Sequence, residues 1–168
     1  MAKRIVTRIG DVFCVEVEGR YKQFFQYIAN DMTCMNSSTI RVFKRRYAMD
    51  YKPIVDDIVN DEVEFYAHTV LKFGIVEGAW YKVGKSSDLG LEALSETFFA
   101  SPIIERPEDQ RVNALLLKWN IWKLDEEKER IQGLSDEIRL KVEFGMIMPW
   151  NSIVSKIKNG YYDSPDFF

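Results

Sequence analysis

The sequence contains few of the residues that crosslink a chain, bind metal ions or interrupt regular structure. It has two cysteines, one histidine, nine glycines and five prolines among 168 residues. Two cysteines exclude the dense disulfide framework of small secreted domains. Cys14 and Cys34 are 20 positions apart and His68 is the single histidine, so no local chelating pair supports a zinc site. The low glycine and proline content also excludes a collagen-like or flexible-linker protein.

Long apolar runs are missing as well. No stretch approaches the ~18 to 20 apolar residues that are needed to span a bilayer. The segment Met1–Arg8 carries three charged residues and lacks the apolar core that is typical of a signal peptide. We therefore expect a cytoplasmic protein whose cysteines are reduced and which does not contact a membrane.

The residues that are present are those of a packed globular protein. Hydrophobic residues make up 46% of the chain and charged residues 29%, with a net charge of −3, which excludes a disordered chain. At about 150 residues per domain, this length predicts a single globular domain over residues 1–168. Composition alone does not define a function.

Hydrophobic periodicity predicts strands with interspersed helices. Alternation over residues 11–18 and 21–29, around Gly19, indicates a β-hairpin, and further strands are expected at 39–46, 63–73, 80–83 and 117–124. Helical spacing follows Pro53, and residues 91–98 fit one helix. We expect an α+β fold: a strongly bent antiparallel β-sheet or partly open barrel, covered by two or three short helices.

The clearest predicted helix follows Pro149. Its apolar residues have the spacing of one helical face, which should pack on the sheet: Trp150, Ile153, Val154 and Ile157. The remaining side chains of the helix should then face water: Asn151, Ser152, Ser155, Lys156 and Lys158.

Residues with catalytic potential are few. His68 shares a predicted strand face with Glu64 and Tyr66, so a general base oriented by a carboxylate is conceivable, and a hydrolase or transferase built on it is one hypothesis. The alternative interpretation, a strand histidine hydrogen-bonded to a neighbour, is favoured because a nearby partner marks a site only probabilistically. We expect no enzyme activity, cofactor or metal.

Binding surfaces are suggested by basic and aromatic residues. One basic cluster contains Arg41, Lys44, Arg45 and Arg46, with Phe43 and Tyr47 interleaved. Such a mixture is used to bind nucleic acids, although the chain is net negative. Aromatic residues near the C-terminus, including Phe167 and Phe168, are possible interface anchors. The predicted partner-binding residues are Arg41, Lys44, Arg45, Tyr66, His68, Tyr161 and Tyr162.

Two motifs in the first half of the chain carry a family resemblance. These are Ile9-Gly10-Asp11-Val12-Phe13 before the hairpin, and Gly78-Ala79-Trp80-Tyr81-Lys82-Val83-Gly84. They resemble the bacterial immunity protein 26 family over residues 9–84. The resemblance implies a small cytoplasmic protein that binds and neutralises a polymorphic toxin. The alternative that the sequence leaves open is a small β-barrel that binds nucleic acid.

Overall fold

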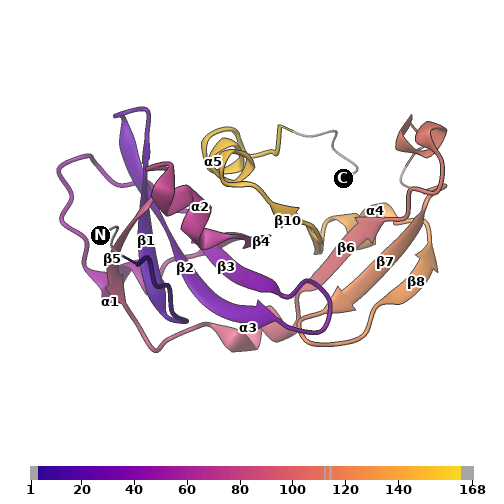
Figure 1. Cartoon of the computed structure of the whole chain (residues 1–168), viewed down its shortest axis with the longest axis horizontal. Coiled ribbons are helices and arrows are strands. Elements are labelled where there is room, and N and C mark those ends of the chain that lie inside the picture. Colours follow the sequence, from indigo (N-terminus) through magenta and orange to yellow (C-terminus); the bar gives the residue numbers. More distant parts are fainter. Residues whose placement is uncertain (1–3, 112, 114, 164–168) are drawn as a thin grey trace.

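The computed structural model describes residues 4–111, 113 and 115–163, and the strands of this part form two sheets placed side by side (Figure 1). The larger sheet has the strand order β10-β4-β3-β2-β1-β5, and the smaller sheet has the order β8-β7-β6-β9. The strands are β1 (Asp11–Val17), β2 (Tyr21–Asp31), β3 (Ser37–Phe43), β4 (Val63–Thr69), β5 (Tyr81–Lys85), β6 (Phe98–Pro102), β7 (Lys118–Lys123), β8 (Glu129–Gln132), β9 (Val142–Phe144) and β10 (Ile147–Met148).

Short helices connect and cover these strands. They are α1 (Val55–Val59), α2 (Leu71–Val76), α3 (Leu91–Ser95), α4 (Asp136–Arg139) and α5 (Trp150–Asn159), with a 3₁₀ turn at Pro107–Arg111. In Figure 1, α2 and α5 lie on one side of the larger sheet, whereas α3 lies on the other side, in the segment that leads to the smaller sheet.

The larger sheet contains most of the hydrophobic core. Its first face carries alternate residues of the hairpin, such as Phe13 and Phe25, which stack with ring centroids 5.1 Å apart. Ile153 and Ile157 of α5 pack on the same face. Register shifts interrupt the β1–β5, β2–β3 and β3–β4 pairings, and such irregularities bend strands and increase their twist.

The second face of the larger sheet is covered in two places. At one end, Ile58 and Val59 of α1 pack against Phe24 and Phe43. At the other end, Phe99 and Trp122 of the smaller sheet, together with Leu94 of α3, pack against Ile28 and Tyr66. Because both faces are covered, these strands are buried over nearly their whole length.

These observations confirm the α+β class with a bent sheet covered by short helices. The pairing is mixed rather than wholly antiparallel, because β10 runs parallel to β4 and β9 runs parallel to β6. In the part of the chain that the structure describes, both sheets have free edges, so neither closes into a barrel.

Three local predictions were wrong. The long strand predicted over residues 63–73 ends at Thr69, and helix α2 follows it. Phe98, assigned to a helix, begins strand β6 instead. In α5, Ser152 and Ser155 are buried and Lys156 is half-buried, because both flanks of this helix, and not one stripe alone, contact neighbouring segments.

Candidate functional site

The predicted basic cluster lies partly on β3, which contains Arg41, and partly on the segment after it, and it is divided between the interior and the surface. Arg41 is buried: its Nε donates to Gln26 Oε1 at 2.9 Å and its Nη2 donates to the carbonyl oxygen of Asp88 at 2.8 Å. Burial lowers the pKa of Arg41, and the carboxylate of Asp88 opposes this shift. Arg41 therefore fastens the segment before α3 to the sheet and does not present its charge to solvent.

The other basic residues of the cluster are exposed. Lys44 pairs with Glu62, with 3.1 Å between Nζ and Oε1. The guanidinium groups of Arg45 and Arg46 lie over the rings of Tyr47 and Tyr21, at 4.9 and 4.5 Å from the ring centroids. The exposed positive charge of this region is thus confined to a short surface segment beside an acidic residue.

His68 is fully buried, at 0% exposure, between the two sheets. Its partner is Asp31, with 3.0 Å between Nε2 and Oδ2, and Trp122 Nε1 donates to the same oxygen at 2.9 Å. Burial alone would raise the pKa of Asp31, but hydrogen bonds from His68, Trp122 and the backbone N–H of Cys34 outweigh it and hold that pKa below its ordinary value. The carboxylate is therefore ionised and joins the larger sheet to the smaller one.

Neither neighbour predicted for His68 on its strand orients the imidazole. Glu64 accepts a hydrogen bond from Gln23 instead, and Tyr66 is buried against Phe99 and Trp122. Without access to solvent, His68 does not reach a substrate in this structure. Its contacts are those of a structural histidine.

The two C-terminal tyrosines have different environments. Tyr161 is 54% exposed, whereas Tyr162 is buried against Phe65 and Phe144. Burial raises the pKa of nearby Glu143 to about 7, despite Lys156 Nζ at 3.8 Å and a hydrogen bond from the backbone N–H of Tyr66. Phe167 and Phe168, the other aromatic residues singled out here, lie outside the described residues.

The seven predicted partner-binding residues therefore do not form one surface. Arg41, Tyr66, His68 and Tyr162 are buried. Of the exposed residues, Lys44 and Arg45 are adjacent on the segment after β3, whereas Tyr161 lies on another segment, after α5.

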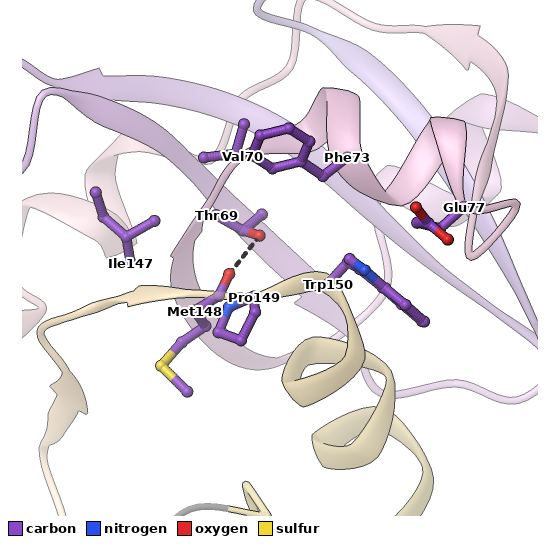
Figure 2. Close-up of a pocket in the computed structure, with 8 residues that line it drawn as sticks. All are labelled: Thr69, Val70, Phe73, Glu77, Ile147, Met148, Pro149 and Trp150. Carbon is purple, nitrogen blue, oxygen red and sulfur yellow. Dashed lines mark hydrogen bonds between the residues drawn. The ribbon is translucent and has the colours of Figure 1, made fainter.

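An apolar pocket lies between α2 and the β10–α5 segment. It has a volume of about 380 Å³ and is lined by Thr69, Val70, Phe73, Glu77, Ile147, Met148, Pro149 and Trp150. Figure 2 shows Val70 and Phe73 above the pocket, on the side of α2, and β10 and the start of α5 below it. We call these eight residues the α2–β10 pocket.

The walls of the α2–β10 pocket are fixed to the core. Thr69 Oγ1 donates to the carbonyl oxygen of Met148 at 2.7 Å, the dashed line in Figure 2. On the other wall, Trp80 Nε1 donates to the carbonyl oxygen of Leu71 at 3.0 Å. A Cβ atom at Gly74 would lie 2.0 Å from the Trp80 ring, so only glycine permits this approach. The pocket is therefore largely preformed.

The side chains that line the pocket are mostly apolar. Phe73 is 59% exposed, and Val70 and Ile147 are also exposed, although large apolar side chains are usually buried. The polar side-chain groups of the lining are the Thr69 hydroxyl, which is already bonded, the Trp150 indole N–H and the Glu77 carboxylate. In the described part of the chain, no group of three or more histidine, cysteine, aspartate or glutamate side chains is placed to hold a metal ion.

The sequence analysis missed this pocket because it interpreted α2 as the end of a strand. The spacing of the helix was nevertheless present. Leu71, Gly74 and Ile75 face inward at i, i+3 and i+4, whereas Phe73 and Val76 are exposed.

Comparison with protein-family models, curated proteins and solved structures gave no match. The residues that carry the resemblance to immunity proteins have structural roles here. Asp11 is buried and pairs with Lys82, with 2.7 Å between Oδ1 and Nζ, and Trp80 packs edge-on against Phe25. None of the helices in the described ranges is both long and apolar enough to cross a bilayer.

Proposed function

We propose that this chain is a non-enzymatic cytoplasmic binding protein of the immunity type, which binds a protein toxin and neutralises it. The observation that carries the proposal is the exposed apolar lining of the α2–β10 pocket, formed by Val70, Phe73 and Ile147. Exposed apolar side chains gathered around a concavity are a feature of protein interaction sites. The resemblance of residues 9–84 to immunity proteins gives the class of partner.

The buried position of His68 also favours binding over catalysis. Its imidazole is bonded to Asp31 and shielded by Phe99, so it has no route to a substrate. A chemical role for His68 would require the two sheets to separate.

A role in nucleic-acid binding has less support. That alternative depends on the cations of β3 and of the segment that follows it, of which Arg41 is buried and Lys44 is paired with Glu62. Affinity for nucleic acid comes largely from neutralised phosphates and falls steeply with salt. Binding of an oligonucleotide at about 50 mM salt, lost in an Arg45→Ala Arg46→Ala double variant, would favour this alternative.

The test of the immunity function is growth rescue. The product of the gene adjacent to this one is expressed in a bacterial host with or without the full chain. Alone it should arrest growth, and the chain should restore growth. Phe73→Asp should abolish rescue, because it places a charge in the apolar pocket. Leu140→Asp is the matched control, since Leu140 is 89% exposed and lies outside the pocket. A neighbouring gene product that does not arrest growth, or full rescue by Phe73→Asp, would contradict the proposal.

A further inference from the structure

The α2–β10 pocket has a charge asymmetry that restricts its occupant. Glu77 is its one charged lining residue, at the C-terminal end of α2 and on the same side of the pocket as Trp150 (Figure 2). Among the described residues, no side chain forms an ion pair or hydrogen bond with the Glu77 carboxylate. Lys72 is on the same helix but does not line the pocket.

The aromatic residues reinforce this asymmetry. Trp150 and Phe73 both line the pocket, and the faces of aromatic rings attract cations. A positive group that reaches Glu77 would therefore find a carboxylate and an indole ring on the same side. An anionic group there would face an unneutralised carboxylate.

The size of the pocket limits what enters it. Its volume of about 380 Å³ is at the low end of the ~300–1,000 Å³ range of ligand pockets. This volume suits one or two side chains from a partner rather than a large ligand. The hydrogen bonds that fix its walls reduce the ordering cost of binding.

We propose that the α2–β10 pocket accepts an apolar side chain of a protein partner next to a lysine or arginine, with the apolar group between Phe73 and Ile147 and the cation at Glu77. The proposal rests on the proposed function, because it takes the occupant to be a segment of a protein.

The test uses the full chain and three capped peptides. All three share a phenylalanine–leucine core and differ in one flanking residue, which is lysine, glutamine or glutamate. Binding is measured by titration calorimetry and by the shift of the Trp150 indole N–H resonance. The lysine peptide should bind roughly two- to fivefold tighter than the glutamine peptide, the range expected for an exposed charge pair, and the glutamate peptide should bind more weakly than both.

Two variants test whether Glu77 determines this order of peptide affinities. Glu77→Gln should remove the difference between the peptides, and Glu77→Lys should reverse it. Phe73→Asp should weaken all three, while Leu140→Asp should change none. For the wild type, the preference should shrink between about 10 mM and 1 M salt, as the screening length falls from about 30 to 3 Å.

The outcomes separate this inference from the proposed function. Equal affinities for the three peptides, a preference for glutamate, or no binding at the Trp150 resonance would overturn the charged-anchor proposal, even if the chain rescues growth. The predicted peptide order without growth rescue would support the pocket's specificity and contradict the immunity function.

Discussion

Trp122→Phe is the substitution that most directly tests the junction between the two sheets. It removes the indole N–H that donates to Asp31 Oδ2 at 2.9 Å and leaves most of the ring packing against Phe99. A hydrogen bond to a charged group contributes about 1.5–3 kcal/mol. The smaller ring also leaves a void beside Phe99, so the free energy of unfolding should fall by about 2–4 kcal/mol in total.

A matched control is Trp80→Phe. It removes the same atoms from another buried tryptophan, whose N–H donates to the uncharged carbonyl oxygen of Leu71. The lost hydrogen bond is then worth about 0.5–1.5 kcal/mol, so urea denaturation at pH 7 should show a smaller loss than for Trp122→Phe. Both variants keep an aromatic ring, which makes the comparison one between a charged and a neutral acceptor.

The pH dependence gives an independent check on the same interaction. Because the pKa of Asp31 is lower in the folded chain than its ordinary value, Asp31 contributes stability above pH ~4, and this is lost as the pH falls through the folded value. The difference between the wild type and Trp122→Phe should therefore shrink below pH ~4. A Trp122→Phe loss no larger than that of Trp80→Phe, or a difference that is independent of pH, would refute the assignment of Asp31 as an ionised link.

Three further substitutions test other parts of the fold. The pKa of Glu143 is about 7, above its unfolded value of ~4.3, so the free energy of unfolding of the wild type should fall by up to about 3 kcal/mol between pH 4 and 8. Glu143→Gln should remove most of that loss, which urea titrations at several pH values would measure. Ile153→Ala should lower the free energy of unfolding by about 2–5 kcal/mol, because Ile153 is fully buried, whereas exposed Asn151→Ala should change it by less than about 0.5 kcal/mol. Gly74→Ala should cost about 1–3 kcal/mol in thermal unfolding, because the added Cβ overlaps the Trp80 ring; an unchanged melting temperature would show that α2 is not held there.

The elements that could be predicted from the sequence are those whose pattern is local. The hairpin followed from alternation on both sides of Gly19, and α5 followed from apolar residues at helical spacing after Pro149. Strand β4 was predicted too long because residues 69–73 continue to alternate in hydrophobicity. Leu71 and Gly74 are also spaced for a helix, but the contact that buries Gly74 comes from Trp80, which lies outside the segment, so the segment alone did not distinguish the two interpretations.

The functional residues were harder to predict, because burial is decided by distant parts of the chain. His68 and Asp31 are 37 positions apart, and Trp122 is 91 positions from Asp31. In the sequence, Arg41 resembles a surface cation, but in the structure it donates hydrogen bonds to Gln26 and Asp88. Polar residues on a strand predict a solvated face only when no other part of the chain covers that face. Here α3 and the smaller sheet cover it.

The same burial that removes His68 and Arg41 from the surface supports the α2–β10 pocket. Asp31 joins the sheets at the end of β2, and β10 pairs with β4 next to His68, with Ile147 opposite His68 and Met148 opposite Thr69. The lower wall of the pocket is therefore attached to the strand that carries the buried histidine. It follows that weakening the Asp31 link should also loosen the pocket, so Trp122→Phe should reduce the affinity of the phenylalanine–leucine peptides without touching them. Unchanged affinity in a folded Trp122→Phe variant would show that the pocket is held by the β10–β4 pairing and α5 alone.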